Sequence, residues 1–217
     1  MPSGFLSAEQ VAAYGRYAAE EPSRAVLERF FFLDDADGAE AGKHRGDHNR
    51  LGYAVQLMTV RHLGRFLPDV LDVPAVMVDY VAEQVGAADP SCLKQYVERR
   101  ATRFEHQAEI VTVYGYVSFA TARDELAGWL DDLARTSGDG PRALFYAAVA
   151  WLRQRQVLLP GVTTLVELVA QVRRAAEDRL HETLAGPVTA GQAHALESVL
   201  QVAPGRRRSP GCRNIDD

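Results

Sequence analysis

Helix-start signals recur along this sequence, and segments with the apolar–polar alternation of a β-strand are scarce. "LSAEQVAAYGRY" places Ser7 as a helix N-cap and Gln10 at the third helical position, which together form a capping box. "DPSCLKQYVERR" places Asp89 as an N-cap, with Pro90 at the first helical position. Apolar residues at helical spacing follow these signals. The sequence therefore predicts an all-α fold, a multi-helix bundle.

Breaks in the helical pattern suggest how the chain is organised. "DDADG" (34–38) is expected to interrupt the pattern, and "TSGDGP" (136–141) is the clearest flexible joint. We expect two small helical lobes, 1–136 and 137–186, followed by an extension over 187–217 with a disordered tail. Further helices are expected over 49–66, 74–85, 89–116 with a break near Thr102, 120–135 and 141–157, and from a capping box of Thr164 and Glu167 to about 184.

Composition places the chain among ordinary globular proteins. With 217 residues, 47% hydrophobic and 24% charged, it can bury a core without disulfides or metals. Cys92 and Cys212 lie far apart and match no zinc spacing, which fits a reducing cytoplasm. No run of about 18 apolar residues and no secretory signal is present, so a membrane span and secretion are not expected.

The net charge of −5 conceals an asymmetry along the chain. Residues 1–42 hold three basic and eight acidic side chains, so the remainder is balanced at 21 of each. The stretch "KHRGDHNRLGYAVQLMTVRHLGRFLPD" (43–69) nevertheless carries five Lys or Arg and three His, with few acidic residues among them. An acidic average opposes indiscriminate nucleic-acid binding but permits a local basic face.

A helical wheel places three arginines of this stretch close together. Arg50, Arg61 and Arg65 fall within roughly 60° of each other at 100° per residue, beside an apolar arc that includes Met58. Two interpretations remain open: the solvated flank of a buried helix, or a stripe that faces phosphates. His62 lies within the apolar arc and is expected to be a hydrogen-bonded core histidine.

Signals for metal binding and catalysis fail on inspection. His44 and His48 have the i, i+4 spacing of a zinc helix, but a glycine lies between them and no Glu follows His44. "LDDADG" lacks both end ligands of a calcium loop, so a turn or helix cap is the expected use of its aspartates. No GxSxG, P-loop or Rossmann fingerprint occurs. We therefore predict no cofactor, no metal and no catalytic residue.

Two further segments bear on nucleic-acid binding. "VERRATRFEH" clusters Arg99, Arg100 and Arg103, which taken alone are more typical of a solvated face. "WLRQRQVLLPGVTTLVELVAQVRR" has the outline of a helix-turn-helix, with Thr163 and Thr164 at the start of its second helix, where free N–H groups attract phosphate. Any helical hairpin has this outline.

Three stretches together resemble one known family. "RGDHNRLGYAVQLMTVRHLGRFLPD" (45–69), "RFEHQAEIVTVYGYVSF" (103–119) and "WLRQRQVLLPGVTTLVELV" (151–169) resemble, in order and spacing, the N-terminal region of Tn3-family transposases, the domain of unknown function DUF4158. The similarity runs from about residue 4 to residue 210. The resemblance implies helical domains that recognise the terminal inverted repeats of a transposon. In that family a separate C-terminal domain with an acidic, metal-binding triad cuts and joins the strands.

The resemblance favours a double-stranded DNA partner and a chain that is not itself an enzyme. The tail "GCRNIDD" departs from the family, which we interpret as a truncation or frameshift before the catalytic domain. A cytoplasmic, nucleoid-associated location follows from this interpretation. The first candidates for DNA contact are Lys43, Arg45, His48, Asn49, Arg50, Arg61 and Arg65, and the second are Arg99, Arg100, Arg103, Arg153, Arg155, Thr163, Thr164 and Arg173.

Other roles remain open at this point. The chain can instead be an interaction module that pairs with itself or with full-length transposase, through "RFFFL" (29–33) or "LFYAAVAWL" (144–152). Both segments are equally typical of buried helices. A decayed remnant without a selected role is a third reading. The DNA-binding hypothesis requires the guanidinium groups near residues 50–65 to point outward, free of the acidic N-terminal residues.

Overall fold

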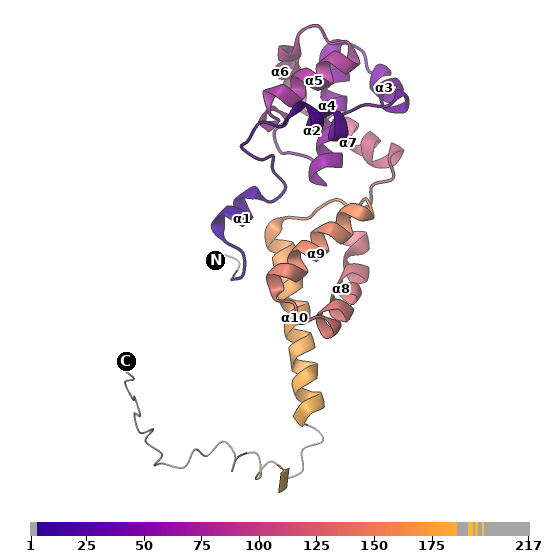
Figure 1. The fold of residues 1–217 in the computed structure, drawn as a ribbon. Helices are drawn as coiled ribbons and strands as arrows, with labels where there is room; N and C mark the ends of the chain where they lie inside the picture. The colour runs from indigo at the N-terminus through magenta and orange to yellow at the C-terminus, as the bar shows by residue number, and fades with distance from the viewer. Residues whose placement is uncertain (1–3, 186–190, 193, 195–196, 198–217) are drawn as a thin grey trace, which may run out of the picture. The chain divides into compact units, whose positions relative to one another are not determined.

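The protein is all-α over the residues that the computed structural model describes, which are 4–185, 191, 192, 194 and 197 (Figure 1). Two short 3₁₀ turns, η1 (Val70–Asp72) and η2 (Pro90–Cys92), occur among the helices. In that part of the chain, the one strand-like feature is an isolated bridge between Val117 and Val157. The helices are α1 (Ala8–Ala13), α2 (Arg24–Phe30), α3 (Asp35–Gly42), α4 (Asp47–Leu63), α5 (Ala75–Val85), α6 (Leu93–Glu98), α7 (Arg100–Val113), α8 (Phe119–Thr136), α9 (Pro141–Gln154) and α10 (Val162–Ala185).

The chain divides into two compact units, Met1–Arg174 and Ala175–Asp217. All the side chains described below belong to the first unit. The lobe boundary near residue 136 and the helix-turn-helix geometry stay predictions. The connection between α9 and α10, residues 155–161, is longer than the three- or four-residue turn of that motif. The expected tail falls on residues outside the described part.

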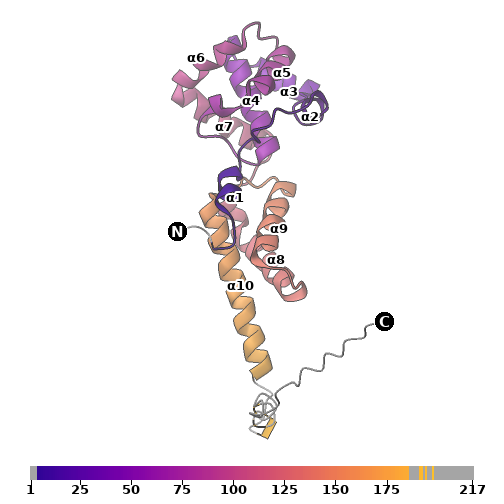
Figure 2. The same ribbon diagram turned by 60° about the vertical axis from the view of Figure 1, so that its left-hand side comes forward.

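Helix α4 lies at the centre of the core. Figures 1 and 2 show it running through the group formed by α2, α3, α5, α6 and α7, and it packs against each of them. Residues 51–60 are all buried, including Gln56 and Thr59. The expectation of one apolar arc beside an exposed stripe was therefore wrong over residues 51–60, because neighbouring helices cover this part of α4 on all sides.

Glycine allows one of these contacts to be very close. A Cβ atom at Gly52 would lie 2.4 Å from the ring of Tyr96 in α6. Tyr96 is itself fully buried. The absence of a side chain at position 52 therefore lets α6 approach the middle of α4.

The expected helix caps are present at three places and absent at a fourth. The capping box of Ser7 and Gln10 and the Asp89 cap are both present. The expected break at residues 34–38 is wrong, because α3 begins there. The expected use of these aspartates as a helix cap is confirmed, since Asp34 caps α3 through a capping box with Asp37. Helix α10 begins at Val162, so Thr164 is already inside the helix and cannot be its N-cap.

Two expected boundaries moved by a few residues. Helix α4 ends at Leu63, where Gly64 adopts the left-handed conformation of a C-cap (φ 78°), so Arg65 lies beyond the helix. The break between α6 and α7 occurs at Arg99 rather than near Thr102.

The two apolar segments considered as interaction surfaces differ in burial. In 144–152 the large apolar side chains Leu144, Phe145 and Leu152 are buried, as expected for core. In 29–33 only the alternate residues Phe31 and Leu33 are buried, and the phenylalanines on either side of Phe31 are exposed. Across the described residues, no helix combines the length and apolar character that crossing a bilayer requires.

Candidate functional site

The Arg61 guanidinium forms an ion pair with a buried carboxylate and is not free to contact a partner. Its Nη1 and Nη2 donate to the two carboxylate oxygens of Asp37, at 2.5 and 2.6 Å, and the Asp37 side chain is 1% exposed. The Tyr114 hydroxyl donates to the same carboxylate at 2.9 Å, and the guanidinium lies 5.0 Å from the Tyr114 ring. Asp37 belongs to the acidic N-terminal residues. The expectation of a free guanidinium at position 61 was therefore wrong.

The other basic side chains of the opening stretch have separate surroundings. Arg50 pairs with Asp47 at 2.7 Å, and Lys43 pairs with Glu40 at 2.6 Å, both between residues three positions apart. The Asn49 amide donates to the Arg45 carbonyl, the Arg45 side chain is exposed, and His48 is half-buried. Arg65 packs its aliphatic part against Gly15. Residues 43–65 therefore do not form one continuous cationic stripe.

Three histidines of the chain belong to buried aromatic clusters. The His44 ring lies 4.1 Å from the His106 ring, and His106 Nδ1 is 3.1 Å from the Tyr96 hydroxyl. Burial, together with the charge of His44, lowers the pKa of His106 to about 4. The His62 ring stacks on Tyr17 at 5.6 Å, but His62 Nδ1 has no hydrogen-bond partner, contrary to expectation. Among the described residues, no group of three or more His, Cys, Asp or Glu could hold a metal ion.

The start of α7 carries a cluster of arginines without carboxylate partners. Phe104 is 48% exposed, and the guanidinium groups of Arg100 and Arg103 lie 5.6 and 5.1 Å from its ring centre. Arg103 Nη1 also donates to the Pro68 carbonyl at 2.8 Å. Within the described residues, Arg99, Arg100 and Arg103 make no ion pair. We name these three arginines with Phe104 the α7 arginine surface.

A buried polar network holds the α7 arginine surface against α4. Gln56, in the middle of α4, donates from Nε2 to the Tyr96 hydroxyl and to the Arg103 carbonyl. Gln107 Nε2 in turn donates to Gln56 Oε1 at 2.7 Å. Buried amides satisfied in this way fix one arrangement of the chain. The backbone at the start of α7 is thus anchored to the most buried helix of the protein.

The candidates in the second half of the chain have other contacts. Arg153 Nη2 donates to the His62 carbonyl, near the end of α4. Arg155 lies over the Trp151 ring at 4.2 Å and 3.6 Å from a Glu125 oxygen. Arg173 donates to a main-chain carbonyl, and Thr163 and Thr164 lie in the first turn of α10.

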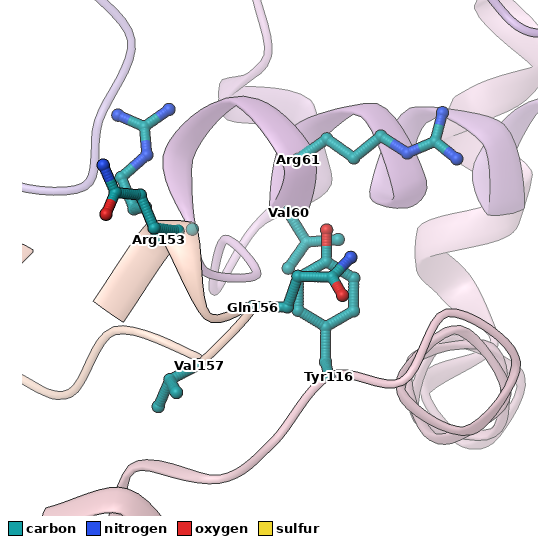
Figure 3. Close-up of a pocket in the computed structure, with 8 residues that line it drawn as sticks. Val60, Arg61, Tyr116, Arg153, Gln156 and Val157 are labelled. Atoms are coloured by element: carbon teal, nitrogen blue, oxygen red, sulfur yellow. The ribbon is translucent and has the colours of Figure 1, made fainter. Parts of the chain in front are cut away.

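A pocket of about 480 Å³ lies where the α9–α10 connection meets the end of α4 (Figure 3). Arg61 and Arg153 both line it, but Figure 3 shows their guanidinium groups diverging, one to either side of the helix end and away from Tyr116 and Gln156. Two arginines that diverge in this way cannot clamp one anion. We therefore place the candidate site at the start of α7 and not in this pocket.

Comparison with known proteins assigns the chain to a family. The sequence pattern that defines the family described as "Domain of unknown function (DUF4158)" matches residues 5–172. The chain belongs to the DUF4158 family.

The relatives of this DUF4158 chain are transposases. It is 41% identical over 211 residues to the transposase for transposon gamma-delta of Escherichia coli (strain K12), covering 96% of this chain and 21% of that protein. It is 30% identical over 196 residues to the transposase for transposon Tn1546 of Enterococcus faecium, covering 90% of this chain and 19% of that protein. The transposase for transposon Tn501 of Pseudomonas aeruginosa is also 30% identical, over 192 residues that cover 88% of this chain and 19% of that protein.

The DUF4158 chain therefore spans about a fifth of the length of the relatives it matches. It is homologous to the N-terminal part of Tn3-family transposases, which confirms the family prediction. The sequence reasoning missed two parts of the candidate site, the exposed Phe104 and the buried Gln56 that anchors it. Phe104 carried a signal, because it directly follows Arg103 in a basic segment. Gln56 carried none.

Proposed function

We propose that this DUF4158 chain binds double-stranded DNA at transposon ends and contacts it chiefly through the α7 arginine surface. The observation that carries the proposal is a group of three arginines free of carboxylate partners, two of which lie against an exposed phenylalanine, in a chain homologous to transposases. The proposed role is recognition of DNA rather than strand chemistry.

The electrostatic argument distinguishes these arginines from the others. A guanidinium already paired with a carboxylate must lose that partner before it can neutralise a phosphate, and a buried pair such as Arg61 with Asp37 is costly to break. Arg99, Arg100 and Arg103 lose no such partner when they turn toward a DNA backbone. Arg100 leaves the face of Phe104, a contact worth roughly 0.5–1 kcal/mol at an exposed site. Arg103 leaves the same ring and also exchanges its hydrogen bond to the Pro68 carbonyl for one to a phosphate.

The position of the cluster suits a phosphate backbone. The first N–H groups of α7 are unsatisfied within the helix and carry the positive end of its dipole, next to the arginines. The exposed Phe104 offers an apolar surface for sugars or for the thymine methyl group. Phosphate contacts would set the orientation of the duplex, and the fixed backbone of α7 would keep that orientation reproducible.

The structure changes the order of the sequence-derived candidates. Arg61 is removed from the proposed interface, and Lys43, Arg50 and Arg155 become weaker candidates because each already has a carboxylate partner. The remaining candidates stay as secondary proposals. They are Arg45, His48, Asn49, Arg65, Arg153, Thr163, Thr164 and Arg173.

Fluorescence anisotropy tests the proposed function directly. The probes are the inverted-repeat end of the element that carries this chain and a scrambled duplex of the same composition, each at 50 and 200 mM salt. If six to ten phosphates are neutralised, the affinity should fall about 10³–10⁵-fold between these salt concentrations. Preference for the real end supports recognition of transposon ends, whereas equal, salt-sensitive binding reduces the claim to a general polyanion surface. No binding to either duplex refutes the proposal.

A second candidate function rests on a different surface. Phe30 and Phe32 are 44% and 62% exposed on either side of the buried Phe31, which favours contact with a second copy or with full-length transposase. Light scattering after size exclusion would detect self-association, and a pull-down would detect the transposase. Substituting both phenylalanines by serine should abolish the association if this surface makes it.

A further inference from the structure

A second basic site lies beside the α7 arginine surface, in a pocket of about 350 Å³ after α1. Arg16 and Arg65 line it together with Leu67 and Pro68. The Pro68 carbonyl is also the group that accepts a hydrogen bond from Arg103. The pocket and the α7 arginine surface therefore share the segment around residue 68.

The backbone at Gly15 brings the two arginines of this pocket together. Gly15 has a φ of 63°, in the left-handed region, and a Cβ atom there would lie 2.3 Å from Arg65 Cδ. Only glycine lets the Arg65 side chain lie directly on this turn without strain. Arg65 is thus held against the turn that directly precedes Arg16, and both side chains line the pocket although they are far apart in the sequence.

The turn itself is fixed on both sides. The Tyr14 hydroxyl donates to the Pro160 carbonyl at 3.1 Å, and the Tyr17 hydroxyl lies 2.9 Å from the buried Thr59 hydroxyl of α4. The Tyr17 ring also stacks on His62. The pocket is therefore formed before any ligand arrives, which reduces the entropy lost on binding.

The charge of the pocket favours an anion. Arg16 and Arg65 make no ion pair within the described part of the chain, and Asp72 is the one carboxylate among the lining residues. Two guanidinium groups against one carboxylate leave a net positive site. Planar guanidinium groups bind phosphate oxygens in pairs, with better geometry than an ammonium group provides.

We infer that this pocket binds one phosphate group, that of a DNA strand which continues onto the α7 arginine surface; this inference rests on the proposed function. A cavity of 350 Å³ is larger than one phosphate requires, and its apolar wall of Leu67 and Pro68 suits the carbon atoms of a sugar. A phosphodiester within a strand therefore fits better than a free phosphate ion.

The salt dependence of duplex binding tests the inference. We would compare wild type, R16Q/R65Q and the control R123Q, an exposed arginine of α8 beside Asp124. Losing one phosphate contact should flatten the slope of log K against log salt concentration by about 0.9. We expect this change for R16Q/R65Q and none for R123Q. A change of about 1.8 would mean two separate contacts, and no change would mean no contact; either result overturns the single-phosphate pocket.

A second measurement separates this inference from the proposed function. The Nε–Hε signals of ¹⁵N-arginine-labelled wild-type protein are followed by NMR during titration with inorganic phosphate. We expect the signals of Arg16 and Arg65 to shift at millimolar phosphate while that of Arg123 does not. If phosphate shifts them but no duplex binds, the proposed function fails and the site is one for free phosphate. If neither phosphate nor duplex affects them, the pocket is not a phosphate site.

Discussion

Replacing Arg61 by alanine should destabilise the protein far more than replacing other arginines of the same segment. Asp37 is 1% exposed, so R61A leaves a buried carboxylate with only the Tyr114 hydroxyl and backbone groups as partners. Removing one member of a buried ion pair typically costs about 3–5 kcal/mol. The Arg61 side chain is 32% exposed, so water can partly replace it, and we expect about 3 kcal/mol. This is a large fraction of a typical unfolding free energy of roughly 5–15 kcal/mol.

Urea denaturation measures this effect. With an m-value of about 2 kcal/mol/M, a loss of 3 kcal/mol lowers the midpoint by about 1.5 M. R50A is the matched control, because the Arg50 side chain is 31% exposed, much like that of Arg61, but its partner Asp47 is 47% exposed and solvated. Such a pair is worth no more than about 1 kcal/mol. Equal midpoints for R61A and R50A would refute the inference that Arg61 stabilises the fold through the buried Asp37 carboxylate.

The pH dependence of the same variants gives an independent check. Burial alone would raise the pKa of the Asp37 carboxyl, but hydrogen bonds from Arg61 and Tyr114 outweigh burial, so its pKa lies below the usual value. Such a group stabilises the fold above the unfolded pKa of about 4, and this stabilisation is lost as pH falls through the folded pKa. The difference in unfolding free energy between wild type and R61A should therefore be largest near pH 7 and decrease in strong acid.

Three further predictions address the core, the histidine cluster and the proposed interface. G52A should lower the free energy of unfolding, measured by urea denaturation, by about 1–3 kcal/mol, because its Cβ would meet the ring of Tyr96. G128A in the open face of α8 should raise it by about 0.5–1 kcal/mol. The folded pKa of His106 is about 4, below its unfolded pKa of about 6.5, so the unfolded chain binds one more proton between these pH values. The stability of the wild type should therefore fall as the pH drops from 6.5 to 4. In H106Q this pH-dependent loss of stability should be absent from melting curves. The triple variant R99Q/R100Q/R103Q should flatten the slope of log K against log salt concentration for duplex binding by up to about 2.7. The control R24Q/R123Q/R135Q, in which each arginine already has a carboxylate neighbour, should bind like wild type in the same anisotropy assay.

Local signals in the sequence sufficed for most helices. The caps at Ser7 and Asp89 each depend on residues within three positions, so a short window contains all the information. Aspartates favour turns as well as helix caps, so residues 34–38 predict a break in the pattern equally well, although Asp34 with Asp37 meets the same capping rule. The glycine at position 64 was an unused signal for the end of α4.

The surroundings of individual side chains could not be predicted in the same way. Arg61 meets Asp37 from a position 24 residues away, and a helical wheel cannot show what covers a helix on its polar side. The burial of Gln56 depends on Tyr96 and Gln107, which come from two other helices. The sequence shows that Arg99, Arg100 and Arg103 are clustered. Whether carboxylates pair with them depends on how the helices pack, so the sequence alone could not predict it.

Arginine footprinting tests the central claim most directly. Wild-type protein is modified with p-hydroxyphenylglyoxal in the absence and presence of saturating inverted-repeat duplex, and the modified arginines are quantified by mass spectrometry. The account predicts that the duplex protects Arg99, Arg100 and Arg103, while Arg24 and Arg123 react equally in both samples. Undiminished modification of the three α7 arginines in the bound state would contradict it.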